Sequence, residues 1–219
     1  MYMRARYEKE LQGIFDSLVQ MGRQIETAIE KCVKAMVDRD FALALEVAED
    51  HKQIDRMERE IEQSCLRILL MEHPVASDFH EVSAALKMIT DLERIGDQAW
   101  DIAEITTQFG EEEYIKKLEH IPQMATIVIQ MVKDGVQAYI QKDLALARSL
   151  DRTDDKVDAL LVAVMRDLTA LIKKNPDNAE QAIMLMMITK YLERIGDHAV
   201  NIGEWVEYAL TGIRPDNEG

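Results

Sequence analysis

The sequence has few of the residues that build strands and turns. Aromatic residues make up 5% of the 219 residues, and there are only 4 prolines and 9 glycines. Strands favour β-branched and aromatic residues, whereas Ala, Leu, Glu and Met favour helices. Methionine occurs 13 times, and hydrophobic residues reach 47%. The composition therefore predicts long helices with enough apolar side chains for a core.

The sequence also has few cysteines and no long apolar run. Cys32 and Cys65 fall on apolar positions of a helical pattern, so we interpret them as small core residues, not as a disulfide or a zinc site. No stretch approaches the ~18 apolar residues that a membrane span needs, and no signal-peptide pattern opens the sequence. We expect a cytoplasmic protein that does not insert into a membrane and reaches one only through partners.

Basic residues are outnumbered, and the usual catalytic motifs are missing. Asp and Glu total 41 against 26 Lys and Arg, a net charge of −15. This charge repels nucleic acid and favours basic protein surfaces or metal ions, although an acidic surface also simply keeps proteins soluble. The sequence has no Gly-rich phosphate loop, GxSxG, CxxC or HExxH, and no Glu-x-x-His of the di-iron type. It therefore lacks the usual signs of a hydrolase or redox enzyme.

What the sequence does contain is an internal repeat. The six residues LERIGD occupy 92–97 and recur, identical, at 192–197. Each copy lies in an apolar pattern of helical period and places a Glu and an Asp four residues apart on one helix face. Such like charges cost a helix a few tenths of a kcal/mol. Because the same unfavourable pair occurs twice, we infer that a positive charge lies between the two carboxylates of each pair.

Apolar residues spaced three and four apart predict three helices in the first half, over about 11–36, 41–71 and 77–109. Asp40 is expected to cap the second helix, Pro74 to follow its end, and Ser77 to cap the third. The second half repeats the plan with a shift of 103 that falls to 100 past the second turn. In the first helix of the second half, Pro122 predicts either a kink or the start of the helix. We predict an all-α fold of two tandem, pseudo-symmetric, antiparallel three-helix bundles, residues 1–110 and 111–219, each with a core of its own.

The turn near residue 75 permits a geometric prediction. Asp55 lies 20 residues before it and His51 lies 24 before, while Glu93 and Asp97 follow it by 18 and 22. Antiparallel neighbours at equal distances from their turn lie level, within about 3 Å for each two residues of difference. The turn near residue 176 gives the same result in the second half. Acidic side chains from two helices should therefore meet in each unit.

Core-facing charges are costly unless paired or metal-bound, so we predict a metal site between the second and third helices of each unit. Oxygen ligands with one imidazole suit divalent or trivalent ions such as Mg²⁺, Mn²⁺, Fe or Ca²⁺, with Zn²⁺ as a further option and more than one ion per unit left open. Gly96 and Gly196 would leave room for an ion or a neighbouring helix. The candidate ligands are His51, Asp55, Glu93, Asp97 and Asp101 in the first unit, and Asp154, Asp158, Glu193, Asp197 and Asn201 in the second.

The alternative is that these acids are solvated and pair with Arg94 or with basic residues of a neighbouring helix. Asp101 and His51 have the same alternative, as a solvated acid and a core-facing histidine. His198 follows Asp197 directly, about 100° further round the helix, and is not expected to be a direct ligand.

The paired LERIGD motif, together with segments 49–55 and 74–78, resembles the PhoU family over nearly the whole sequence. The resemblance implies two similar three-helix bundles side by side. It also implies E(D)xxxD metal motifs, matched here by Glu93/Asp97, Glu193/Asp197 and Asp154/Asp158. The sequence departs from the pattern at two positions: His51 replaces the first acid of its pair, and Asn201 replaces an acid that is present at Asp101.

The resemblance further implies a non-enzymatic cytoplasmic adaptor, often a homodimer. It would act with the phosphate ABC transporter, through its ATPase, and with the sensor histidine kinase, and would negatively regulate the phosphate regulon and restrain uptake. Two other functions stay open. One is a carboxylate-bridged, metal-dependent phosphohydrolase, and the other is a metal-free helical scaffold that only dimerises.

Overall fold

The computed structural model describes residues 2–71, 76–110 and 113–214. These residues form six long helices and two short 3₁₀ turns, with no strand among them, which confirms the predicted all-α class. The elements are α1 (Tyr2–Asp38), α2 (Phe41–Met71), α3 (Ala76–Thr106), η1 (Thr107–Phe109), α4 (His120–Gln141), α5 (Leu144–Lys174), η2 (Pro176–Asn178) and α6 (Ala179–Thr211).

The corners between the first two helices of each unit are built alike. Arg39 and Lys142 adopt left-handed backbone conformations with φ of 57° and 56°. After them, Asp40 accepts a hydrogen bond from the amide of Leu43 at 3.0 Å, and Asp143 accepts one from Leu146 at 3.0 Å. These carboxylates satisfy helix amides that have no partner within the helix. The predicted cap at Asp40 is confirmed.

Two predicted helix starts need correction. Helix α3 begins at Ala76, so Ser77 lies inside its first turn instead of at the cap. Helix α4 begins at His120, which places Pro122 third in the helix, where a missing amide hydrogen loses no intrahelical bond. The predicted turn at 72–74 lies outside the described residues, beyond the last residue of α2.

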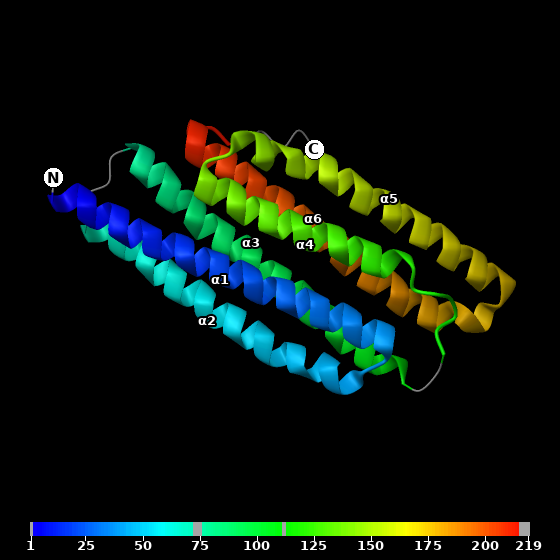
Figure 1. Ribbon diagram of the computed structural model, residues 1–219. Helices are drawn as coiled ribbons and strands as arrows, with labels where there is room; N and C mark the ends of the chain where they lie inside the picture. Colours follow the sequence, from blue (N-terminus) through cyan, green and yellow to red (C-terminus); the bar gives the residue numbers. More distant parts are fainter. Residues whose placement is uncertain (1, 72–75, 111–112, 215–219) are drawn as a thin grey trace.

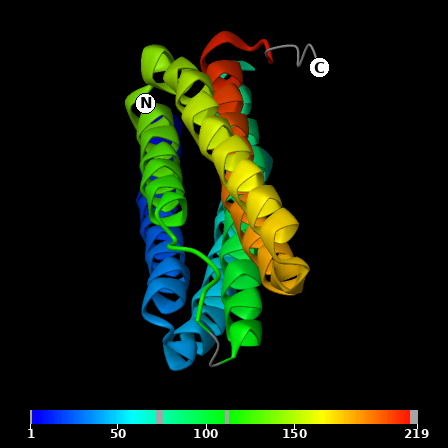
Figure 2. The same ribbon diagram turned by 90° about the vertical axis from the view of Figure 1, so that its right-hand side faces the viewer.

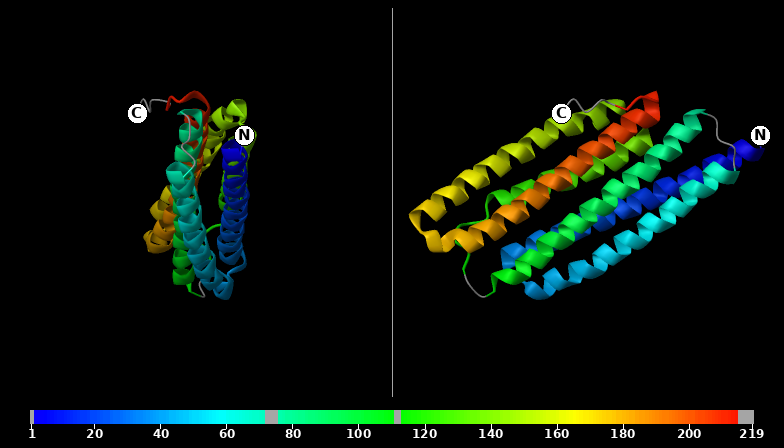
Figure 3. Two further views of the ribbon diagram at one scale, coloured as in Figure 1. Left: turned by 90° about the vertical axis from the view of Figure 1, so that its left-hand side faces the viewer. Right: turned by 180° about the vertical axis from the view of Figure 1, so that it is seen from behind.

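The two units lie side by side. Helix α3 packs most extensively against α6, and α1 contacts α4, while α2 and α5 pack against helices of their own units. In Figure 1, α1 and α4 lie in front and run in opposite directions. Figure 2 shows the second unit in front of the first, with α4 over α1 and α6 over α3. The right-hand view of Figure 3 places α3 and α6 centrally, with α2 and α5 at the edges.

The buried apolar side chains form one cluster that runs through both units. Each unit has apolar contacts among its own three helices, and the α3–α6 contact joins the buried residues of the two units. Leu92 and Leu192, the first residues of the two LERIGD copies, are both fully buried. Cys32 and Cys65 are buried free thiols, as their positions predicted.

A polar cluster lies inside the α3–α6 contact. Asp91 of α3 accepts hydrogen bonds from three side chains of α6: Nδ1 of His198 at 2.9 Å, Nδ2 of Asn201 at 3.1 Å and Nε1 of Trp205 at 3.0 Å. The Asp91 side chain is 13% exposed. Because buried donors without acceptors are costly, this carboxylate fixes how the two units are placed along each other.

We expect Asp91→Ala to lower the free energy of unfolding by about 2–4 kcal/mol, because three partly buried donors lose their acceptor together. Urea unfolding followed by far-UV circular dichroism measures the change. The control is Asp16→Ala, whose exposed carboxylate accepts only from Gln12 on the same helix. It should stay within about 0.5 kcal/mol of the unmodified protein. Equal effects of the two substitutions would contradict this role for Asp91.

Candidate metal centres

The first acid site consists of His51 and Asp55 on α2 with Glu93 and Asp97 on α3. Nε2 of His51 lies 2.8 Å from Oδ1 of Asp97, at hydrogen-bond distance, and 3.7 Å from Oδ1 of Asp55. One ligand atom from each of these three residues lies within 4.8 Å of the other two. Oδ1 of Asp55 is buried and has no hydrogen-bond partner. The structure thus brings these side chains to one level of the α2–α3 pair.

Part of the charge at the first acid site is neutralised by protein. Arg94 donates to Oδ2 of Asp97 at 2.9 Å and lies 3.5 Å from Oε2 of Glu93. Even so, burial and then the neighbouring Asp97 raise the pKa of Glu93, against the opposing effect of Arg94. Arg94 is itself 56% exposed, and such exposed pairs contribute little. The alternative drawn from the sequence is therefore present in part, while Oδ1 of Asp97 remains turned toward His51.

The second acid site consists of Asp154 and Asp158 on α5 with Glu193 and Asp197 on α6. Burial, followed by the charges of Asp197, Asp158 and Glu193, raises the pKa of Asp154 to about 7. Lys190 forms an ion pair with one oxygen of Glu193, whose residue is only 8% exposed. Oδ1 of Asp154 and Oε2 of Glu193 are buried without a hydrogen-bond partner. This site therefore holds more negative charge than the nearby cation balances.

The ligand atoms of the second acid site are more widely spaced than those of the first. Among the described residues, the His51, Asp55 and Asp97 set alone brings three metal-ligating atoms within 4.8 Å of one another. The four carboxylates of the second site influence each other electrostatically but do not meet this spacing. An ion there would be held partly through water.

The two motif glycines have different neighbours. A Cβ atom on Gly196 would lie 2.3 Å from Oδ1 of Asp154, whereas one on Gly96 would lie 3.0 Å from Cδ1 of Ile54. Gly196 therefore makes room for the Asp154 carboxylate, and Gly96 makes room for an apolar side chain of the neighbouring helix. The sequence predicted space at both glycines without distinguishing what fills it.

The two remaining predicted ligands, Asn201 and Asp101, lie in different surroundings. The Asn201 amide donates to Asp91 across the unit boundary, so it is directed away from the second acid site. Burial raises the pKa of Asp101, and the charge of Asp97 raises it further, while Arg194 of α6 and His51 lower it. Asp101 is therefore close enough to the first acid site to interact with its charges. His198 also points at Asp91, in agreement with the prediction that it is not a direct ligand.

Sequence reasoning missed residues that surround the acid sites. Glu58 acts on Glu93, and Asp151 acts on Asp154, each raising the pKa of its neighbour after the larger effect of burial. Both lie three residues from a predicted ligand on α2 or α5, so helical spacing alone gives a signal for them. The cation at the second site, Lys190, lies three residues before Glu193 and carries the same signal.

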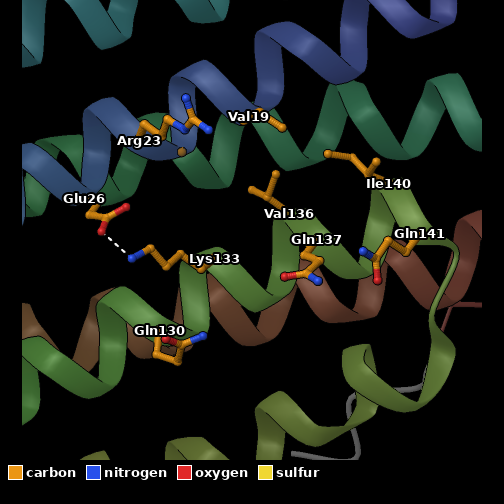
Figure 4. Close-up of a pocket in the computed structure, with 10 residues that line it drawn as sticks. Val19, Arg23, Glu26, Gln130, Lys133, Val136, Gln137, Ile140 and Gln141 are labelled. Carbon is orange, nitrogen blue, oxygen red and sulfur yellow. Dashed lines mark ion pairs between the residues drawn. The ribbon is translucent and has the colours of Figure 1, made fainter.

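A separate pocket lies between α1 and α4 (Figure 4). Val19, Gly22, Val136 and Ile140 form its apolar part, and an ion pair between Glu26 and Lys133 crosses it. None of the residues that line this pocket belongs to either acid site. The acid sites lie on α2, α3, α5 and α6, so the pocket and the acids occupy different helices.

Comparison with known proteins identifies the family. A family model, the PhoU domain, matches residues 18–106 and 121–206, one copy in each three-helix unit. The chain belongs to the PhoU family. The resemblance read from the LERIGD motifs is confirmed. Within the part of this PhoU chain that the structure describes, no helix is both long enough and apolar enough to cross a bilayer.

Curated and solved PhoU relatives match nearly end to end. A phosphate-specific transport system accessory protein PhoU homolog of Clostridium acetobutylicum is 32% identical, with 96% of each chain covered. The solved PhoU of Pseudomonas aeruginosa superposes with a TM-score of 0.89 at 33% identity, covering 94% of this chain and 100% of that one. A phosphate transport system regulatory protein PhoU from Streptococcus pneumoniae has a TM-score of 0.89 at 25% identity, covering 96% and 99%.

We expect the contribution of Asp154 to the stability of the metal-free protein to decrease as the pH rises from about 4 to 7. The folded pKa of Asp154, about 7, lies above its ordinary value of 3.8, so the folded state binds this proton more tightly than the unfolded state does. Its contribution is full below pH 4 and is lost as the pH passes 7. After allowance for partial exposure, we expect Asp154→Asn to be more stable than the unmodified protein by about 1–2 kcal/mol at pH 7.5, with chelator present.

Denaturant unfolding at pH 4 and pH 7.5 tests this expectation, and the difference should disappear at the lower pH. The control is Asp155→Asn, at the adjacent exposed position. It should leave the free energy of unfolding unchanged at both pH 4 and pH 7.5. An Asp154→Asn protein that is less stable at pH 7.5 would contradict the assigned repulsion.

Proposed function

We propose that this protein is a non-enzymatic, cytoplasmic regulator of a phosphate transport system and that it binds divalent cations at its two acid sites. The first part is supported by the family and by relatives named as accessory and regulatory proteins of phosphate transport. Its partners would be the phosphate ABC transporter, through the ATPase, and the sensor histidine kinase. It would act on them as a homodimer that restrains uptake and represses the phosphate regulon.

The observation that carries the second part is the set of buried carboxylate oxygens without partners. At the acid sites they are Oδ1 of Asp55, Oδ1 of Asp154 and Oε2 of Glu193. A fourth such oxygen, Oδ2 of Asp50, lies outside the sites, 2.8 Å from Nζ of Lys31. Buried acceptors are nearly always satisfied, and a divalent cation satisfies carboxylates by direct coordination. The donors present, carboxylates with one imidazole, are ordinary ligands of Mg²⁺, Mn²⁺, Fe and Zn²⁺. The residues therefore fit a metal ion.

A bound cation would neutralise the acid sites and join α2 to α3 and α5 to α6. The chain's own residues do the rest. Arg94 and Lys190 hold Glu93, Asp97 and Glu193 in place from the solvent side. Because the net charge is −15, the surface attracts basic segments of a partner, and the metal content sets the local charge that such a segment meets. This arrangement suits regulated docking.

The rival function, a metal-dependent phosphohydrolase, would need a substrate pocket at the metal. Enzyme sites are concave and enclose most of a small ligand. The pocket between α1 and α4 has no residue of either acid site in its lining. This pocket therefore offers no substrate site beside either acid site, which supports the regulator.

We expect the combined substitutions Asp97→Asn and Asp197→Asn to remove most of the bound metal. An amide lacks the anionic oxygen that a hard cation prefers, and even changes around a metal's ligands cost about 10–100-fold in affinity. Elemental analysis of the purified full chain measures the metal content. The control combines Asp16→Asn with Asp155→Asn, at two exposed acids outside the sites. This control protein should keep its bound metal. Unchanged metal content in the Asp97/Asp197 variant would contradict the assigned sites.

The proposed partners are tested by co-expression of the full chain with the phosphate transporter and its ATPase in high- and low-phosphate medium. We expect the transporter to co-purify with the unmodified protein, and more of it at high phosphate. Quantitative immunoblotting of the ATPase against the chain gives the ratio.

An absence of co-purification in both media would contradict the regulator. Hydrolysis of phosphate esters by the metal-loaded protein, lost in Glu93→Gln, would support the hydrolase in its place.

A further inference from the structure

We propose that the two acid sites take different cations: the first a transition ion of the Zn²⁺ class, the second a hard, oxygen-seeking ion of the Mg²⁺ class. This inference rests on the proposed metal binding and assigns each site its ligand. It follows from one position at which the two halves of the chain differ.

The internal repeat provides the comparison. Under the shift that relates the two units, Asp55 corresponds to Asp158, and the LERIGD acids at 93 and 97 correspond to those at 193 and 197. Among the four residues that make up each acid site, only His51 has a chemically different counterpart, Asp154. The first acid site therefore offers a nitrogen ligand and three carboxylates, and the second offers four carboxylates. Imidazole suits Zn²⁺ and Fe, whereas carboxylates alone suit Mg²⁺, Ca²⁺ and Mn²⁺.

The first acid site has the spacing of direct coordination. Zinc binds imidazole nitrogen and carboxylate oxygen at about 2.0–2.2 Å, which puts neighbouring ligand atoms roughly 3.0–3.4 Å apart in octahedral or tetrahedral arrangements. Nε2 of His51 lies 2.8 Å from Oδ1 of Asp97 and 3.7 Å from Oδ1 of Asp55, on either side of this range. The three ligand atoms lie within 4.8 Å of one another, so side-chain adjustment would be needed to bring all of them onto one ion.

The second acid site has features of a hard-cation site. Its carboxylates do not reach the mutual spacing found at the first site, and Mg²⁺ commonly keeps several waters between itself and the protein. Glu193 is 8% exposed, and its Oε2 is buried without a partner. Oδ1 of Asp154 is also unpartnered and is fitted closely over Gly196. Two unsatisfied buried oxygens, with no nitrogen among the four ligands, call for an ion that prefers oxygen.

The test compares the two sites in the chelator-treated full chain. Asp158→Asn with Asp197→Asn leaves only the first site, and Asp55→Asn with Asp97→Asn leaves only the second. Calorimetric titrations with Zn²⁺ and with Mn²⁺, a hard-ion probe, give two dissociation constants for each site. Zn²⁺ exceeds Mn²⁺ in raw affinity at most sites, so the ratio of the two constants is the informative quantity. We expect the preference for Zn²⁺ to be at least about tenfold greater at the first site.

The decisive variant is His51→Asp, which copies the second site's residue into the first. It should lower Zn²⁺ affinity at the first site by about tenfold or more and bring the Zn²⁺/Mn²⁺ ratio to that of the second site. In nitrogen-15 NMR spectra of the unmodified protein, Zn²⁺ should shift the ring nitrogen resonances of one of the 5 histidines, His51, and Mg²⁺ should shift none. Unchanged Mn²⁺ binding at the second site of this variant shows that the chain remains folded.

Equal ratios at the two sites, or a His51→Asp protein with an unchanged ratio, would overturn this inference while leaving metal binding intact. Failure of both ions to bind either site would overturn the metal-binding function as well. Loss of all binding in His51→Asp, the second site included, would count against the assignment of His51 to the first site alone.

Discussion

The packing of α3 against α6 is the interaction on which the rest of the molecule depends. Each of these helices carries one LERIGD copy, and the buried leucine of each copy lies in the shared core. Apolar burial supplies the attraction, and the Asp91 cluster fixes the position of one helix along the other. With α3 and α6 fixed, α2 and α5 can pack only on the remaining sides. That leaves each acid site between a central helix and an edge helix.

Much of the fold could be predicted because helices carry their signal locally. The helix predicted over about 41–71, from its apolar period, the cap at Asp40 and the proline at 74, agrees with α2 (Phe41–Met71). The carboxylate that caps this corner, Asp40, recurs at Asp143. The shared core could not be predicted, since periodicity tells which face of a helix is apolar but not which neighbour covers it. The start of α3 was missed by one residue for a similar reason: a serine near a helix start often caps it, but it can also lie in the first turn.

The candidate sites divide in the same way. Equal distance from a turn placed His51, Asp55 and Asp97 together, because this depends only on helix rise and antiparallel pairing. The direction of Asn201 could not be predicted, since it depends on Asp91, which lies far away in the sequence and across the unit boundary. The ion pairs of Arg94 and Lys190 join residues three apart on one helix, so helical spacing could indicate them. The exposure of these pairs, which limits their effect, could not be predicted from the sequence.

The two motif glycines show that a repeated segment can have an identical sequence and different packing neighbours. Gly96 yields space to the hydrocarbon of Ile54, and Gly196 yields space to the carboxylate of Asp154. A larger residue would be unfavourable at both positions, at Gly96 through core packing and at Gly196 through the placement of a charge. The same six residues therefore meet different requirements in the two halves, and the role of each glycine depends on the side chain that lies over it.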